Sequence, residues 1–263
     1  MKIFGLNIWQ LLMKTTDIVL SFLNNFINFL NLLNFKQRAI LKLNDKNLGE
    51  GGDVFIVLNG PSISNQDLCK LEGKCTIFVN RGYQHSCYER IKPKYHVFVD
   101  SKMLNGIWSI DWFYKIKSLS PDTTFILPVS WYHKKEFKEL YLSGVKIHWM
   151  TTKYRLSSLG VAGNCIEFAM QQNFKKIFIT GFEATGIAHE LCNSRSHFYG
   201  INSENNRKNT LDYAQDLYMH STHLRSLNRL ADYASKKDIK IVNLTQGGIL
   251  DMFQREDFNK AIE

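Results

Sequence analysis

Short apolar runs alternate with helical patterns along most of this chain of 263 residues. The runs are rich in β-branched and aromatic side chains, and each one stops at small or polar residues, as buried strands of a parallel sheet do. The expected strands are 53–58, 76–80, 95–100, 124–128, 146–149, 176–180 and 240–244, and the two clearest helices are 160–173 and 211–235. Strands that alternate with helices imply βαβ units. The pattern therefore predicts an α/β fold, with a Rossmann-like and mostly parallel sheet flanked by helices.

The amino-terminal 47 residues follow a different pattern. Apolar side chains of 18–33 cover a broad helical face, whereas Ser21 and a series of asparagines form a narrow polar stripe. Asp17 and the asparagines interrupt any apolar run of about eighteen residues, so we expect no membrane span. No small-residue cleavage site marks a signal peptide. Basic residues at 36–46 follow the apolar face, which favours a helix in the plane of a membrane surface; packing on the domain or on a second subunit stays the alternative.

Two further segments organise the rest of the chain. Three glycines in 47–53 predict a linker, so the chain divides into 1–47 and a globular domain at 48–263. Residues 184–209 are polar and lack periodicity. An irregular stretch of this length in a compact domain is usually functional or disordered, and we expect a lid over about 184–220.

Composition adds two expectations. The net charge of +9 favours acidic partners such as nucleotides, anionic sugars or anionic lipid. The lysines are dispersed and no aromatic–basic motif occurs, so we expect no nucleic-acid partner. The five cysteines are scattered without a CxxC pair, which favours a reducing cytoplasm and neither a disulfide framework nor a zinc ribbon.

The most informative stretch follows the first strand, where the apolar run ends in Asn59-Gly60-Pro61-Ser62. Asn59 and Gly60 tolerate the dihedrals of a tight turn, and Pro61 fixes its exit. Ser62 or Ser64 can then cap the helix that follows. Ligands of open α/β sheets bind beyond the carboxyl ends of the strands, so this turn is a candidate phosphate or nucleotide site. Other strand ends that would meet at the same edge carry Asn80, Arg81, Asp100, Ser101, Glu183 and Thr245, although turns without ligands favour the same residue types.

Several familiar sites are missing from the sequence. No GxGxxG follows the first strand, and neither a GxxxxGK[ST] loop nor an Asp-x-Asp pair occurs. His189, Cys192 and His197 lack the spacing of a zinc site, so we expect no metal. His220 lies where the predicted lid meets the long helix. A neutral imidazole there is suited to taking a proton from a sugar hydroxyl, and a surface or capping role is the alternative.

Taken in order, these residues resemble bacterial glycosyltransferase family 42, the sialyltransferases that use CMP-sialic acid. The likeness rests on Asn59-Gly60-Pro61-Ser62, Asn80 and Asp100 after the first three strands, then on Leu159-Gly160-Val161, the segment 177–183 and His220-Ser221. The ending 243–248 also resembles the related flagellin-modifying transferases of the motility-associated factor type. Short motifs carry the likeness over about residues 53–250.

The resemblance implies roles for individual residues. Those assigned to nucleotide or donor binding are Asn59, Gly60, Pro61, Ser62, Asn80, Arg81, Asp100, Ser158, Gly160, Gly181 and Glu183. Asp100 stands where the family has an asparagine. His220 would be the general base that activates the acceptor hydroxyl for in-line attack with inversion. A CMP donor carries one phosphate and the family needs no metal, so no cofactor is expected.

The chain also departs from the family. The family's tyrosines that bind the leaving phosphate have no counterpart beside Gly181. His189, Arg195, His197 or Tyr199 could supply donors in their place. The donor sugar therefore stays open between sialic acid, another nonulosonic acid and Kdo, and the amphipathic amino terminus would fit an acceptor on a membrane lipid, such as growing lipopolysaccharide.

We therefore expect a metal-independent inverting glycosyltransferase that moves an acidic nonulosonic sugar from CMP to a glycan or lipid-linked glycan. It would lie at the inner face of a bacterial cytoplasmic membrane, and a homo-oligomer remains open. One alternative is a pterin diphosphokinase-like transfer of diphosphate from ATP, which needs magnesium carboxylates that are few here. The other is a non-catalytic module that binds an anionic ligand or a membrane, although no clustered basic face is apparent.

Overall fold

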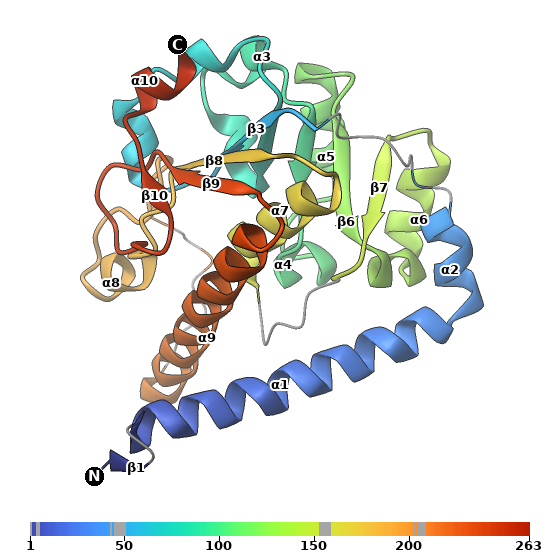
Figure 1. Ribbon diagram of the computed structural model, residues 1–263. Coiled ribbons are helices and arrows are strands. Elements are labelled where there is room, and N and C mark those ends of the chain that lie inside the picture. Colours follow the sequence, from blue (N-terminus) through green and yellow to red (C-terminus); the bar gives the residue numbers. More distant parts are fainter. Residues whose placement is uncertain are drawn as a thin grey trace.

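The computed structural model describes residues 2–3, 6–42, 44, 51–152, 159–201, 204 and 209–263. Within them, eight parallel strands form one sheet in the order β10-β9-β8-β3-β4-β5-β6-β7 (Figure 1). These strands are β3 (Asp53–Val57), β4 (Thr76–Val79), β5 (Tyr95–Val97), β6 (Thr124–Pro128), β7 (Ile147–Met150), β8 (Lys176–Thr180), β9 (Lys240–Asn243) and β10 (Gln254–Arg255). A separate antiparallel pair joins β1 (Lys2–Ile3) to β2 (Leu6–Asn7). The predicted Rossmann-like α/β fold is confirmed.

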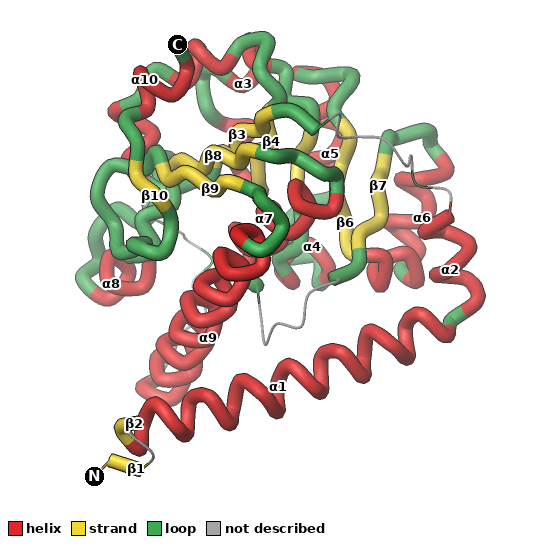
Figure 2. Tube along the Cα trace, viewed as in Figure 1, coloured by secondary structure: helices red, strands yellow, loops and turns green. Residues whose placement is uncertain are grey.

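Helices cover both faces of the sheet, and Figure 2 shows them in red around the yellow strands. The α-helices are α1 (Ile8–Leu33), α2 (Phe35–Lys42), α3 (Tyr88–Ile91), α4 (Ser101–Leu104), α5 (Asp111–Leu119), α6 (Lys135–Leu142), α7 (Gly160–Gln171), α8 (Gly186–Leu191), α9 (Thr210–Ser235) and α10 (Phe258–Ile262). Shorter 3-10 helices occupy Pro61–Asn65, Leu68–Leu71, Asn80–Gln84 and Val129–His133.

Alternate side chains of the central strand β3 enter two different cores. Val54 and Ile56 pack with α7 and α9 on one face, while Phe55 and Val57 pack with α3, α5 and α6 on the other. All four side chains are buried. Because both faces are covered, the strand reads as one continuous apolar run. Burial of a side chain of this size stabilises the fold by about 1.5–3 kcal/mol, so the two cores together fix the sheet between its helices.

The order of the strands reverses at β3. From β3 the chain builds outward through β4, β5, β6 and β7, and it then returns to place β8 on the other side of β3. Val57 pairs with Thr180 in the register of these two strands, so the turns that follow them lie side by side. In open α/β sheets, ligands bind beyond the carboxyl ends of the strands at such a switch point.

The predicted elements agree closely with the observed ones. All seven predicted strands are present, with ends within three residues of the prediction, and α7 and α9 match the two predicted helices. The strand β10 was not predicted, because its two exposed residues carry no hydrophobic pattern. The predicted linker at 47–53 lies largely outside the described residues.

The segment predicted as a lid is partly regular. Gly186–Leu191 forms the short helix α8, and α9 already begins at Thr210, so 210–220 belong to the long helix. A capping box fixes this start: Asn209 Oδ1 accepts from the backbone N–H groups of Leu211 and Asp212, at 2.9 and 3.1 Å. The Asp212 carboxylate accepts in return from Asn209 N. The Asn-x-x-Asp spacing was the sequence signal for this boundary.

The amino-terminal helix α1 runs along the bottom of Figure 1 and meets α9. Asp17 is only 6% exposed, and its two oxygens accept from Arg225 Nε and Nη2 at 2.8 and 2.9 Å. Ser21, one turn later, is buried on the same face. Asp17 and Ser21 of α1 therefore face the domain.

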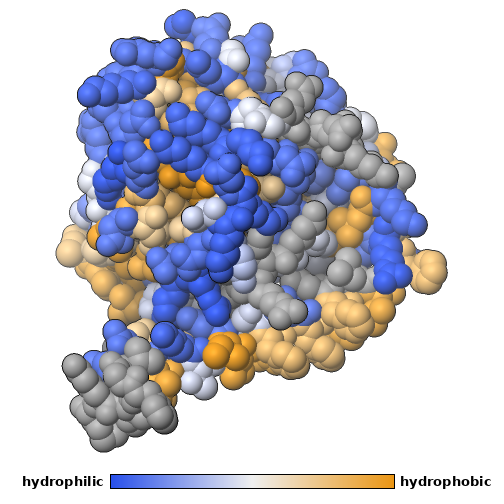
Figure 3. All heavy atoms as spheres, in the orientation of Figure 1, coloured by the Kyte–Doolittle hydropathy of each residue, from blue (hydrophilic) through white to orange (hydrophobic). Residues whose placement is uncertain are grey.

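The apolar face of α1 is exposed instead, and Figure 3 shows it as an orange band along the lower edge of the molecule. The exposed side chains of this face are Trp9, Leu12, Met13, Ile18, Val19, Phe22, Leu23, Phe26, Ile27, Phe29, Leu30 and Leu33. Single exposed apolar residues are normal, but a contiguous band of this length marks a surface that meets another apolar phase or partner. None of the described helices combines the length and apolar character that crossing a bilayer requires.

The cysteines differ from the expectation that none is paired. Cys69 and Cys87 form a disulfide, with their Cα atoms 5.1 Å apart. Their separation of 18 residues hid this proximity, which arises because the 3-10 helix Leu68–Leu71 packs on α3. The other cysteines are free. Among the described residues, Asp67, Cys69 and Cys87 are the one group spaced to hold a metal, and the disulfide removes both thiolates from it.

Candidate active site

A cavity of about 760 Å³ lies at the carboxyl ends of the central strands. The turns after β3, β4, β5 and β8 form its floor, and residues of α7 and α9 form one wall. Its position at the switch point and its size are those of a small-molecule site. The predicted site residues that line it are Asn59, Gly60, Asn80, Asp100, Gly160, Gly181, Glu183, His197, Tyr199 and His220.

The turn after β3 is tied to its neighbours through its backbone and one amide. Gly60 N donates to Gly181 O at 2.8 Å, and Asn59 Nδ2 donates to Val79 O at 3.2 Å. Phe198 N, from the predicted lid, donates to Asn59 O at 2.9 Å. The buried Asn59 Oδ1 has no hydrogen-bond partner among the described residues. These hydrogen bonds hold the turn against β4, the turn after β8 and the predicted lid.

Glu183, rather than a serine, accepts a hydrogen bond from the start of the 3-10 helix Pro61–Asn65. Its Oε1 accepts from Ser62 N at 2.7 Å, at the start of the 3-10 helix, and that helix has no side-chain cap from Gly60. The prediction that Ser62 or Ser64 caps it is therefore wrong. A Cβ built on Gly60 would lie 1.7 Å from Glu183 Oε2 and 2.5 Å from Gly181 O. Only glycine allows these two turns to approach so closely.

Asn80 adopts a positive φ of 47° at the end of β4. Asparagine tolerates this left-handed conformation better than most residues. A hydrogen bond from His96 holds the backbone of Asn80 in place. His96 Nε2 lies 3.0 Å from Asn80 O, and His96 Nδ1 lies 2.9 Å from the Tyr88 hydroxyl. A carbonyl can only accept, so Nε2 carries the proton and Nδ1 accepts from Tyr88. Asn80 Oδ1 is buried at the cavity and has no hydrogen-bond partner among the described residues.

The His96 imidazole stays neutral. Burial lowers its pKa to about 3, and the hydrogen bond to Asn80 O opposes that shift only in part. Sequence reasoning missed His96, because a histidine inside an apolar strand looked like part of the core. It is a positioning residue for the Asn80 turn.

Asp100 lines the cavity but already has a structural partner. Its Oδ1 accepts from Lys102 N at 2.9 Å and so caps α4. Ser101 and Lys102 line the cavity beside it, and the Lys102 ammonium lies 5.7 Å from the Trp108 ring. Thr245, at the end of β9, instead accepts from Phe182 N at 3.0 Å and supports the turn after β8.

His220 lies within α9 rather than at its start, and it faces the cavity together with His223. The two ring centroids are 6.2 Å apart. The His223 ring covers Gly160, where a Cβ would lie 3.1 Å from His223 Nδ1 and where φ is 56°. Burial, and to a lesser degree His220, lowers the pKa of His223 to about 4, so it is neutral at pH 7. The sequence analysis did not identify His223 as part of this wall.

The four lid residues proposed to contact a leaving group separate into two pairs. His197 and Tyr199 line the cavity, and burial lowers the pKa of His197 and raises that of Tyr199. Arg195 is exposed and donates to His197 O and Phe198 O within its own segment. His189 lies 2.9 Å from Ser194 Oγ and does not line the cavity.

Three other predicted site residues lie elsewhere. Pro61 and Ser62 belong to the 3-10 helix just behind the cavity lining, and Arg81 pairs with Glu204 beside the cavity. Ser158 lies outside the described residues. The buried Ser196 Oγ, which was not predicted, belongs to a cavity-lining residue and has no hydrogen-bond partner among the described residues.

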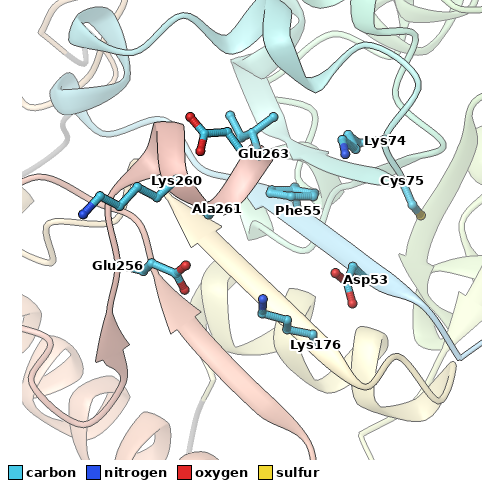
Figure 4. A pocket seen from close by; sticks show the side chains of 10 residues that line it. Asp53, Phe55, Lys74, Cys75, Lys176, Glu256, Lys260, Ala261 and Glu263 are labelled. Carbon is cyan, nitrogen blue, oxygen red and sulfur yellow. The ribbon is translucent and has the colours of Figure 1, made fainter.

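A second, smaller pocket of about 380 Å³ lies at the amino ends of β3 and β8 (Figure 4). It combines three lysines with three carboxylates: Lys74, Lys176, Lys260, Asp53, Glu256 and Glu263. These charges offset one another, and no predicted site residue lies there. The carboxyl-edge cavity is therefore the candidate active site of this Rossmann-like fold.

No protein-family model matches the chain, and no curated protein matches its sequence. Solved structures that are similar to it include a MAf glycosyltransferase from Magnetospirillum magneticum AMB-1, with 11% identity over 79% of this chain and a TM-score of 0.48. This chain spans only 34% of the length of that protein. Transferases of both kinds that the sequence motifs resemble occur among the similar structures.

Two further similar structures are of a sialyltransferase. One is CstII from Campylobacter jejuni in complex with a substrate analogue, cytidine-5'-monophosphate, with 15% identity, 78% of this chain and 84% of that chain covered, and a TM-score of 0.48. The other is CST-II in complex with a trisaccharide acceptor and CMP, with 16% identity, 77% and 85% covered, and a TM-score of 0.44. The ligand of this chain is therefore inferred below from the residues of its own cavity.

Proposed function

We propose that the chain is a metal-independent glycosyltransferase, which moves an acidic nonulosonic sugar from a CMP donor to a hydroxyl of a glycan acceptor with inversion. The observation that carries the proposal is that Asn59, Asn80 and His220 line one cavity from three separate elements. The sequence motifs that resemble CMP-sugar transferases assign nucleotide binding to the two asparagines and base catalysis to the histidine.

The asparagine oxygens favour a ligand that donates hydrogen bonds. Asn59 Oδ1 and Asn80 Oδ1 are both buried and have no partner among the described residues. An acceptor left in this state costs about 1–3 kcal/mol, which a donating ligand would recover. Ribose hydroxyls and the exocyclic amine of cytosine are such donors, so a cytidine nucleotide suits this floor of the cavity.

The transfer needs a base for the acceptor and stabilisation for the leaving phosphate. The acceptor oxygen attacks the anomeric carbon while His220 takes its proton, and the bond from that carbon to the CMP oxygen breaks with its electron pair on CMP. The leaving group carries one phosphate, for which the cavity offers Lys102, His197 and Tyr199. These side chains take the role that the family gives to tyrosines.

Turnover of CMP-sugars in the presence of EDTA tests this proposal. We expect the full chain to consume CMP-sialic acid or CMP-Kdo without added metal, and His220→Ala to lose at least about 100-fold in turnover while it still binds CMP. His133→Ala, at an exposed histidine of the Val129–His133 helix, is the matched control. Unchanged turnover in His220→Ala would contradict the assignment of the base. Magnesium-dependent use of ATP with no use of any CMP-sugar would favour diphosphate transfer instead.

We further propose that α1 lies on an anionic membrane surface. Asp17 and Ser21 are turned to the domain, where Asp17 pairs with Arg225, so the exposed apolar band is free to enter the headgroup region. The exposed cations Lys14, Lys36 and Arg38 flank that band, and their charge complements anionic lipid. A lipid-linked glycan would then be presented to the same molecule.

Vesicle co-sedimentation tests the membrane proposal. We expect the full chain to bind vesicles that contain anionic lipid more strongly than zwitterionic ones, and the double variant Phe22→Asp, Phe26→Asp to lose this binding. Leu142→Asp, at an equally exposed apolar residue of α6, should keep it. Concentration-dependent dimerisation through α1 with no vesicle binding would show that a second copy covers the apolar band, and it would overturn the proposal.

A further inference from the structure

A carboxylate is bound beside the cavity by two side chains that are far apart in the sequence. Arg81 Nη2 and Trp108 Nε1 donate to Oε1 and Oε2 of Glu204, so each carboxylate oxygen has its own donor. The Arg81 and Glu204 side chains are 16% and 22% exposed. This is a well-shielded, two-point recognition of a planar carboxylate.

Aromatic rings and a second cation surround this pair. The Arg81 guanidinium carbon lies 5.3 Å from the Trp112 ring centroid and 5.6 Å from that of Tyr199. The Lys102 ammonium lies 5.7 Å from the centroid of the Trp108 ring. Rings at these distances hold the guanidinium in place and keep water away from it, which strengthens its bond to an anion.

The Arg81–Glu204 pair also adjoins the cavity. Trp108, Lys102 and Tyr199 line the cavity, and Arg81 follows the cavity residue Asn80 directly. Arg81 Nε is buried and has no hydrogen-bond partner among the described residues.

We propose that Arg81 and Trp108 form the subsite for the carboxylate of the acidic sugar, and that Glu204 occupies it until the sugar binds. This inference rests on the proposed function. A 2-keto acid sugar presents a planar carboxylate next to its anomeric carbon, and the two donors already bind that group in Glu204. Two carboxylates cannot share one pair of donors, so Glu204 and the sugar compete. The subsite selects acidic sugars, and Glu204 lowers their apparent affinity.

Binding measurements on the full chain separate the sugar carboxylate from the nucleotide phosphate. CMP, free sialic acid and the methyl ester of sialic acid are titrated calorimetrically into the wild type, Arg81→Gln, Trp108→Phe and Glu204→Gln. Trp108→Phe keeps the ring and removes only its N–H. Arg90→Gln, at an exposed arginine of α3 that pairs with Glu72, is the matched control.

We expect the wild type and Arg90→Gln to bind sialic acid at least about tenfold more tightly than its ester, since a charge-assisted hydrogen bond is about twice as strong as a neutral one. Arg81→Gln and Trp108→Phe should lose this preference and bind CMP as the wild type does. Glu204→Gln should bind sialic acid about tenfold more tightly, because an amide competes less well for the guanidinium.

Three results would overturn the subsite. The wild type could bind acid and ester equally well, CMP affinity could fall in Arg81→Gln as much as sugar affinity, or Glu204→Gln could weaken sugar binding. The second result would assign Arg81 to the phosphate, and the third would make Glu204 a structural clamp. If the wild type does not bind CMP, the proposed function is wrong. Binding of free sialic acid that depends on Arg81 would still support the subsite in that case.

Discussion

Acidification should weaken the fold through His96, which supports the Asn80 turn. The ordinary pKa of a histidine is 6.5, and burial lowers that of His96 to about 3 in the folded protein. The unfolded chain therefore binds a proton at this residue between pH 6.5 and pH 3, while the folded chain does not. Stability is unaffected above that window and falls as the pH decreases through it.

The size of the effect follows from the two pKa values. Between pH 7 and pH 5, linkage gives a loss of about 2 kcal/mol from His96 alone. His96 is completely buried, so no discount for solvent screening applies. His223 has a pKa lowered in the same direction, and its contribution is common to all the proteins compared.

Urea unfolding of the wild type and His96→Gln at pH 7 and pH 5 measures this term. Glutamine lacks a titrating ring but retains an N–H that can reach Asn80 O. We expect His96→Gln to be less stable at pH 7 by about 1–3 kcal/mol, through lost packing, and to lose about 2 kcal/mol less than the wild type on going to pH 5. His133→Gln, at an exposed histidine, controls for the removal of one imidazole. Equal losses in the wild type and His96→Gln would refute the reasoning.

Three further perturbations test the scaffold of the site. Gly60→Ala should abolish CMP binding and destabilise the chain by about 2 kcal/mol or more, because its Cβ would overlap Glu183; chemical denaturation and calorimetry would detect both, and wild-type behaviour would contradict the close approach of the two turns. Asp17→Leu should lower the free energy of unfolding by about 3–5 kcal/mol, because it leaves Arg225 without its charged partner. Limited proteolysis should then cut α1 more readily, and unchanged protection of α1 would count against its contact with α9. Reduction of the Cys69–Cys87 bond should lower the free energy of unfolding by about 3 kcal/mol for a loop of this length, and an unchanged urea midpoint with dithiothreitol would argue that the bond is absent in solution.

The sequence was sufficient for seven of the sheet's eight described strands because these strands consist mainly of buried residues. Runs such as 53–58 and 176–180 therefore appear as uninterrupted apolar segments, and parallel strands bring the polar residues that follow them to one edge. This is why Asn59, Asn80 and Glu183 could be grouped before their positions were known.

The contacts that the sequence did not reveal join residues far apart in the chain. Neither the pairing of Arg81 with Glu204 nor that of Asp17 with Arg225 leaves a periodic signal. The same is true of the bond from Ser62 to Glu183, which a local rule for helix caps assigned to a serine. Tertiary contacts between residues far apart in the chain replaced local chemistry at these places.

Ligand-induced thermal stabilisation tests directly whether the protein binds CMP. The full chain is heated with CMP, CDP, UDP, GDP or ATP, each with EDTA or with magnesium. A ligand that binds only the folded state raises the melting temperature by mass action. We expect a shift with CMP that persists in EDTA and is lost in Asn80→Ala. A shift that occurs only with ATP and magnesium, or no shift with any nucleotide, would contradict the assignment of this cavity to a CMP-sugar.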